Sequence, residues 1–287
     1  MGDLEPPFDS NVTINDQLEN SLKSKLDILF VTNHNTLDGF KQITDYKHDH
    51  EKFSNLKVYP AVEVTTDKEA HVLVYGLQDE IKSNQSIDQI LDAAKSQDAV
   101  TIAPHPFSLV DALRDDSLKC DLFEIFNSAN VDIYSNKKAE IFAKENNLLT
   151  TAGSDSHVAS TIGRCINLIN SENNLDDVIS AMKKGKISIE KTEYITRHEI
   201  LEHIQYKIEN SKEYIDQYVQ EFYPKYSWLF NMMYRSYMFT KKSLIWDATL
   251  KIALFGLRRI SYKINFKGYD PSTFKTRDIP TITKMIF

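Results

Sequence analysis

An aspartate and a histidine stand two residues apart in the stretch 148–164, Leu-Leu-Thr-Thr-Ala-Gly-Ser-Asp-Ser-His-Val-Ala-Ser-Thr-Ile-Gly-Arg. Residues 148–151 have the composition of a short buried strand, residues 152–154 are small, and Asp155 and His157 follow them. A carboxylate and an imidazole placed in this way can converge on one cation, and this donor pair suits Mn, Fe or Zn. The same letters also fit a helix N-cap turn followed by a surface histidine.

Histidines and acidic residues also occur at the ends of other short apolar runs. They are His34 after residues 26–32, Glu63 at the end of 58–64, His105 after 99–103, and Glu124 late in 121–126. His71 differs, because it opens the run 71–75. In a closed parallel sheet the carboxyl ends of all strands meet on one face, where active sites lie. Since scattered surface histidines would have no reason to follow strand ends, the pattern predicts a polynuclear metal site.

The elements that must position these side chains are βα units. From residue 12 to residue 190, short apolar runs alternate with stretches of helical periodicity, which is typical of helices around a parallel sheet. Helices are expected at residues 16–25, 87–96, 135–146 and 175–184.

Length and composition are those of a soluble protein. The chain has 287 residues, 41% of them hydrophobic and 26% charged, enough for one large α/β domain with an extension. Two cysteines cannot form a disulfide framework, which favours a reducing compartment. No apolar run reaches transmembrane length, and the first residues do not resemble a secretion signal, so a cytoplasmic location is expected.

The charge changes sign along the chain. Residues 1–190 carry 18 Lys and Arg against 31 Asp and Glu, whereas residues 191–287 carry 16 against 10. A change of this kind often accompanies a change of role. Two parts are therefore predicted: a metal-binding barrel domain over residues 1–190 and a basic, aromatic-rich helical extension over residues 191–287.

Within the extension, residues 193–222 are expected to form one long polar helix, and residues 225–267 one or two amphipathic helices. Residues 225–287 hold 12 Lys and Arg against 3 Asp and Glu, interleaved with aromatic side chains. Three explanations stay open: packing on the barrel or on a second subunit, RNA binding through basic groups and rings, or binding to a membrane surface through residues 244–264. The sequence leaves the oligomeric state undetermined.

Over roughly residues 3–190 the chain resembles the PHP (polymerase and histidinol phosphatase) family, and most closely its TrpH-like phosphoesterase branch. The resemblance rests on Thr-Asn-His at 32–34, Pro-Ala-Val-Glu-Val at 60–64, His-Val-Leu-Val-Tyr-Gly at 71–76, Ala-Pro-His-Pro at 103–106, Phe-Glu-Ile-Phe-Asn at 123–127, Ala-Gly-Ser-Asp-Ser-His at 152–157 and Ile-Gly-Arg at 162–164.

The resemblance implies a distorted seven-stranded β/α barrel, an α/β fold, with two or three divalent metal ions (Mn, Zn or Fe). It implies the metal ligands His34, Glu63, His71, His105, Asp155 and His157. Asp9 is a further candidate, because it stands about as far before His34 as the aspartate of the family's Ser-Asp-Gly turn does from the matching motif.

Two departures from the family pattern affect the expected site. The family opens with His-x-His, whereas this chain has Glu5-Pro6-Pro7 and no histidine before His34. Its Thr-Asp-His motif is here Thr32-Asn33-His34, which removes a carboxylate of the kind that orients metal ligands. Three explanations for the missing His-x-His pair stay open: the sequence is truncated, the first strand is lost or altered, or Glu5 partly substitutes for the histidines.

The expected chemistry is hydrolysis of a phosphate ester. Clustered divalent cations lower the pKa of water and clamp phosphoryl oxygens, with Glu63 and Asp155 as bridging ligands. Arg164 is predicted as the catalytic phosphate clamp, because a guanidinium matches two phosphate oxygens; the alternative is a surface arginine. The expected substrate is a phosphorylated small molecule, a nucleotide or a short oligonucleotide. The rival hypothesis is a catalytically impaired PHP-derived metal-binding or regulatory protein whose basic tail binds RNA or a membrane surface.

Overall fold

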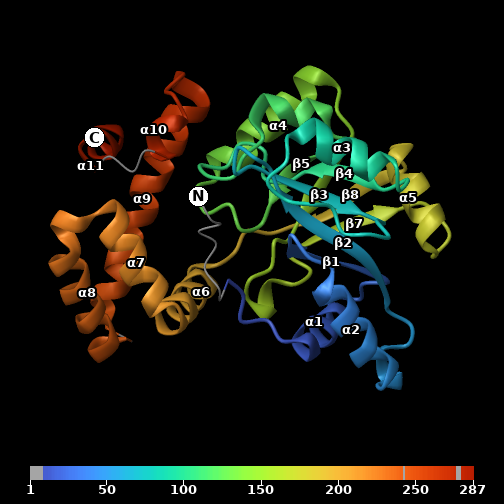
Figure 1. Cartoon of the computed structure of the whole chain (residues 1–287), viewed down its shortest axis with the longest axis horizontal. Coiled ribbons are helices and arrows are strands. Elements are labelled where there is room, and N and C mark those ends of the chain that lie inside the picture. The colour runs from blue at the N-terminus through green and yellow to red at the C-terminus, as the bar shows by residue number, and fades with distance from the viewer. Residues whose placement is uncertain (1–8, 242, 276–278) are drawn as a thin grey trace.

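The structure, a computed structural model, describes residues 9–241, 243–275 and 279–287 (Figure 1). Among these residues, eight strands lie in the first two thirds of the chain. Six of them form one curled sheet in chain order: β1 (Ile28–His34), β2 (Lys57–Thr65), β3 (His71–Tyr75), β4 (Val100–Ala103), β5 (Leu122–Asn127) and β6 (Thr150–Gly153). A separate pair comprises β7 (Cys165–Ile169) and β8 (Ile187–Thr192).

Helices surround the sheet and form the extension. Those of the sheet domain are α1 (Ile14–Lys23), α2 (Asp38–His48), α3 (Ile87–Lys95), α4 (Tyr134–Asn146) and α5 (Leu175–Lys183). Those of the extension are α6 (Arg197–Asn210), α7 (Lys212–Phe222), α8 (Ser227–Thr240), α9 (Leu244–Lys267), α10 (Ser272–Lys275) and α11 (Ile279–Ile286). The expected helices 16–25, 87–96, 135–146 and 175–184 are therefore confirmed within two residues at each end; α2 was not among them.

The sheet is mixed, so the expectation of an all-parallel sheet is wrong. β1 and β2 are parallel, as are β4, β5 and β6, but β3 runs antiparallel to both of its neighbours. Because β3 is reversed, its first residue, His71, pairs with Thr65 at the end of β2. The start of β3 therefore lies at the same edge as the carboxyl ends of the parallel strands.

The α/β class is confirmed, but the described residues form a six-stranded main sheet rather than the expected seven-stranded barrel. Two side chains join β7 to the β6 end of the sheet. The Asn167 amide accepts from the Ala152 N–H at 3.1 Å and donates to the Ala152 carbonyl at 2.8 Å, and Ser154 Oγ, directly after β6, accepts from the Cys165 N–H at 2.9 Å. β8 pairs antiparallel with β7. The expected domain boundary after residue 190 falls inside β8.

Alternating side chains bury both faces of the sheet. Val72 and Val74 face a core that includes α3 and α4, whereas Leu73 between them faces a second core with Val178 and Met182 of α5. This is the two-residue period that a pleated strand imposes. Glu63 pairs in register with Leu73, which places its carboxylate on the α5 side of the sheet.

The extension lies beside the sheet domain, with α6 next to it and α7 and α8 farther out (Figure 1). The single helix expected over 193–222 is instead two, because the chain breaks at Ser211 between α6 and α7. The region 225–267 forms two helices, as one of the alternatives expected. No helix within the described residues is long and apolar enough to cross a bilayer.

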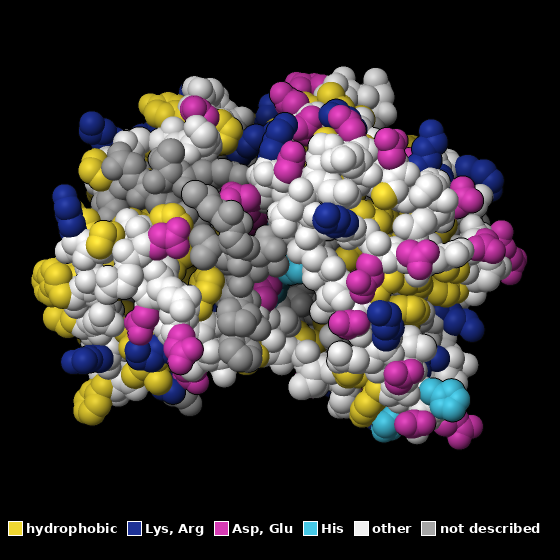
Figure 2. Space-filling model, in the orientation of Figure 1, with side chains coloured by type: hydrophobic (Ala, Val, Ile, Leu, Met, Phe, Trp, Pro, Cys, Tyr) yellow, Lys and Arg dark blue, Asp and Glu magenta, His cyan; other side chains and the backbone are white. Residues whose placement is uncertain are grey.

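The aromatic side chains of the extension divide into packed and exposed groups. Tyr262 and Phe266 of α9 pack on Tyr134 of α4, which supports docking on the sheet domain. Phe239 and Leu244 are 91% and 86% exposed, and hydrophobic side chains reach the surface over α8 (Figure 2). Binding of RNA or a membrane surface by residues 225–287 stays a prediction.

Candidate metal centre

One buried carboxylate faces three imidazole rings at the shared edge of β1, β2 and β3. Glu63 Oε1 lies 3.0 Å from His71 Nδ1 and 3.3 Å from His105 Nε2, and Glu63 Oε2 lies 3.8 Å from His34 Nε2. His34 and Glu63 are register partners on adjacent parallel strands. His34, Glu63 and His71 each offer a ligand atom within 4.8 Å of the others, so they define a first candidate cation site.

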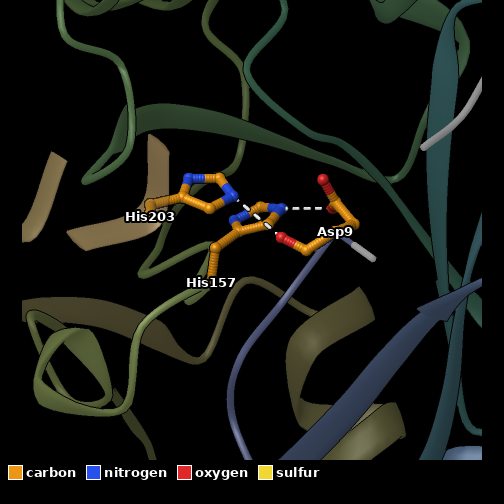
Figure 3. A group of neighbouring side chains, drawn as sticks. All are labelled: Asp9, His157 and His203. Carbon is orange, nitrogen blue, oxygen red and sulfur yellow. Dashed lines mark hydrogen bonds and ion pairs between the residues drawn. The ribbon is translucent and has the colours of Figure 1, made fainter. Parts of the chain in front are cut away.

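A second group of possible ligands forms around Asp9. Its Oδ2 lies 2.7 Å from His157 Nε2, and its main-chain oxygen lies 2.8 Å from His203 Nε2 (Figure 3). The His157 and His203 rings stack with centroids 4.8 Å apart. Asp9, His157 and His203 also offer ligand atoms within 4.8 Å of one another. This group is a second candidate cation site.

The two groups are joined through Asp9. Its Oδ2 lies 4.0 Å from His34 Nε2, a member of the first group. On the far side, Asp155 Oδ1 lies 3.4 Å from His157 Nδ1. The structure therefore brings all seven predicted ligands into one continuous chain of contacts. A histidine and an acidic side chain are visible in the hollow between the sheet domain and the extension (Figure 2).

The backbone at two predicted ligands is in the left-handed region. His105 has φ of 31° and Asp155 has φ of 46°, a conformation that costs energy for residues other than glycine and is concentrated at functional sites. Buried Glu124 supports both loops: its Oε2 accepts from the His105 N–H at 2.6 Å and from Asn127 Nδ2 at 3.0 Å. Asn127 Nδ2 also donates to Asp155 Oδ2 at 3.2 Å.

Burial and charge set the protonation of these groups. Burial raises the pKa of Glu63, but the charges of His71 and His34 and hydrogen bonds from His71 and His105 hold it well below its usual range. Burial lowers the pKa of His157, yet Asp155 and Asp9 raise it to about 10. Burial, together with the charge of His157, lowers the pKa of His203 to about 4. His203 is therefore a neutral imidazole at pH 7.

The donor set fits divalent metal ions of borderline softness. Neutral imidazoles and carboxylates are the ligands that Zn, Mn and Fe accept in proteins. In this structure ring nitrogens of His71 and His105 lie 3.0 and 3.3 Å from Glu63 Oε1, and a ring nitrogen of His157 lies 2.7 Å from Asp9 Oδ2. The same atoms could therefore serve as metal ligands. The identity and number of the ions stay predictions.

Arg164, the predicted phosphate clamp, lies in ion pairs at the start of α6. Its Nη2 is 2.6 Å from Glu199 Oε1 and its Nη1 is 3.3 Å from Glu193 Oε2. Glu199 also closes the capping box of α6 with Thr196. In this arrangement Arg164 ties α6 to the sheet domain, and its role in binding phosphate stays a prediction.

The Glu199 ion pair predicts a pH-dependent stability. Burial raises the pKa of Glu199, but hydrogen bonds from Thr196, Arg164 and Ser160 lower it to about 2 from a usual 4.5. A depressed carboxyl pKa stabilises the fold above pH 4.5, and this stabilisation is lost as the pH falls towards 2. Urea unfolding at pH 7 should show Glu199→Gln to be less stable by up to about 3 kcal/mol. The exposed Glu190→Gln is the control, and an unchanged pH dependence in Glu199→Gln would contradict this role.

Sequence reasoning missed two residues of the site, His203 and Lys207 of α6. Lys207 Nζ lies 2.6 Å from Asp9 Oδ1. Glu199, His203 and Lys207 are spaced four residues apart, a spacing that places side chains on one helix face. The four-residue spacing was the only feature of the sequence that could have indicated these residues. It shows that they share one face of α6, but it does not show which part of the protein that face contacts.

Of the two departures from the family pattern, Asn33 lies within the described residues and Glu5-Pro6-Pro7 does not. Asn33 points away from its neighbour His34, and a Cβ added at Gly39 would lie 1.7 Å from the Asn33 Oδ1 atom. Asn33 is therefore packed against the start of α2. Residues 5–7, which stand where the family has His-x-His, lie outside the described residues.

The histidines and carboxylates that converge at one edge of this α/β sheet form two groups that could hold metal ions. Residues 134–187 match the family model described as PHP-associated, a segment that includes Asp155, His157 and Arg164. Over these residues the predicted resemblance to PHP proteins is confirmed, whereas its TrpH-like branch stays a prediction. No curated protein matches the chain.

Several solved structures are similar to this one at low identity. PsfC from Pseudomonas syringae PB-5123 is 16% identical over 67% of this chain and 88% of its own, with a TM-score of 0.49. The lesion-specific endonuclease PfuEndoQ from Pyrococcus furiosus is 16% identical over 64% of this chain and 56% of its own, with a TM-score of 0.46. A protein from Bifidobacterium adolescentis, described as a candidate metal-dependent phosphoesterase, is 14% identical over 70% of this chain and 98% of its own, with a TM-score of 0.42.

Proposed function

We propose that the chain is a metal-dependent phosphoesterase that hydrolyses a phosphate monoester, a nucleotide or a short oligonucleotide. The observation that carries the proposal is that Glu63, with its three imidazole neighbours, lies next to the Asp9–His157 pair at one edge of the sheet. His34 Nε2 joins the two groups, 4.0 Å from Asp9 Oδ2. The PHP-associated match over residues 134–187 supports it.

Divalent cations at this edge would lower the pKa of water and neutralise the developing charge of a phosphoryl group. The chain's own residues supply the framework. Glu63 would offer a carboxylate to one cation and Asp9 to another, each with histidines beside it. Glu124 holds the His105 main chain in its left-handed conformation. Lys207 adds a positive charge beside Asp9, which favours an anionic substrate at the same edge.

The alternative is a PHP-derived metal-binding or regulatory protein without turnover. One observation favours it: the Lys207 ammonium group forms an ion pair with Asp9, so a positive charge already lies against one of the predicted ligands. The residues Glu5-Pro6-Pro7, which stand where the family has His-x-His, favour it as well.

Metal-dependent phosphate release distinguishes the two. Protein stripped by a chelator should be inactive on p-nitrophenyl phosphate and on nucleotides, and should regain activity with Mn²⁺, Zn²⁺ or Fe²⁺. Asp155→Asn or His157→Ala should lower the rate more than about 100-fold, since loss of even the outer partners of metal ligands costs 10- to 100-fold. Asp79→Asn, in an exposed loop, is the matched control. Folded protein that releases no phosphate with any of these metals would contradict the enzyme and favour the alternative.

A further inference from the structure

We propose that α6 of the extension supplies a ligand to the metal centre: His203 is the third donor of a cation site formed with Asp9 and His157. The site would take a divalent cation of borderline softness, such as Zn²⁺, Mn²⁺ or Fe²⁺. The inference rests on the proposed metal-dependent function only in assuming that the centre binds metal.

The geometry of the three residues is that of a ligand set. They come from three segments far apart in the chain, yet each offers a ligand atom within 4.8 Å of the others. The rings of His203 and His157 lie over each other, and their edges face Asp9 (Figure 3). All three are half-buried, so a small ion could enter from solvent.

Asp9 can serve a cation while it keeps its ion pair with α6. Its Oδ1 accepts from Lys207 Nζ at 2.6 Å, whereas its Oδ2 faces His157 at 2.7 Å and His34 at 4.0 Å. The two oxygens thus have different partners, and Oδ2 is the atom turned to the histidines. Lys207 stabilises the ionised carboxylate that a cation requires.

Contacts on either side of His203 hold α6 against this site. Glu199, four residues before it, binds Arg164, and Lys207, four residues after it, binds Asp9. Glu202 accepts from Asn11 Nδ2 at 3.3 Å. Contacts before and after His203 along α6 therefore hold this face of the helix against the site.

His203 also contacts the Asp9 main-chain oxygen at 2.8 Å, so a purely structural role must be separated from ligation. A glutamine at this position keeps an N–H donor for that oxygen but lacks the imidazole nitrogen. His203→Ala and His203→Gln together distinguish the two roles. His198→Gln, an exposed histidine on the same helix, is the matched control.

The experiment measures metal binding by the full chain. Metal-free protein is titrated with Co²⁺, followed by its visible absorption, and with Zn²⁺ by calorimetry. Wild-type protein should show two classes of site, one abolished by Glu63→Gln and the other by Asp9→Asn. His203→Ala and His203→Gln should weaken the Asp9 class by about 10- to 100-fold and leave the Glu63 class unchanged. His198→Gln should bind as wild type does.

Three results would overturn the assignment: a single class of site that Glu63→Gln removes entirely, unchanged Asp9-class affinity in His203→Ala, or affinity restored by His203→Gln. Circular dichroism of each variant confirms folding. Because the readout is binding, protein that binds two classes of ion without hydrolysing any ester supports His203 as a ligand while contradicting the proposed function.

Discussion

Glu63→Gln is expected to abolish binding at the first cation site and to reduce metal-dependent hydrolysis more than about 100-fold. Glu63 is the only carboxylate within 4 Å of His34, His71 and His105 together among the described residues. An amide keeps the volume of the side chain but removes its charge. Three imidazoles would then face a neutral, weakly ligating group.

The measurement is metal content and affinity of purified protein, followed by turnover on p-nitrophenyl phosphate. Glu145→Gln, on the exposed face of α4, removes the same charge away from the site and should have no effect. Unchanged metal affinity in Glu63→Gln would show that this carboxylate is structural rather than a ligand.

Gly153→Ala is expected to destabilise the protein by about 1–3 kcal/mol and to weaken metal binding. A Cβ at this position would lie 1.9 Å from Glu124 Oε1. Glu124 is buried, and it holds the His105 main chain. To relieve the clash, either Glu124 or β6 must move. Movement of Glu124 would displace His105, whose N–H it binds, and movement of β6 would displace Asp155, which follows that strand.

Thermal and urea unfolding measure this effect, and metal titration measures its consequence. Gly256→Ala, inside α9, is the control, because its Cβ would meet the end of Ile286 at 3.2 Å and alanine favours a helix by up to about 1 kcal/mol. If the clash with Glu124 is the cause, the cost of Gly153→Ala should shrink in a Glu124→Ala background. An equal cost in both backgrounds would refute that cause.

Much of the sheet domain could be predicted from the sequence because its signals are local. The run 71–75 matches β3 without error, and the boundaries of four helices lie within two residues of the expected ones. Hydrophobic periodicity and helix-capping signals involve only a few neighbouring residues, so they can be recognised in the amino-acid sequence. The placement of ligand-type residues at strand ends was likewise a local pattern, and all seven come together.

The strand direction that explains His71 was not visible in the apolar run itself, because a five-residue run looks the same in parallel and antiparallel sheets. The signal for the reversal lay in the connection 66–70, which is too short for the crossover that joins neighbouring parallel strands. The structure places β3 antiparallel, and His71 at its start thereby joins Glu63 near the end of β2. The odd position of this histidine in the sequence is a consequence of strand reversal.

The sequence by itself determined the α/β class, the ligand-type residues of the sheet domain and the resemblance to PHP proteins. Only the tertiary structure decided that Arg164 pairs with Glu199 and that His203 and Lys207 reach Asp9. These contacts join residues 35 to 198 positions apart. They follow from how α6 packs on the sheet domain, and no spacing within either segment encodes where two separate surfaces meet.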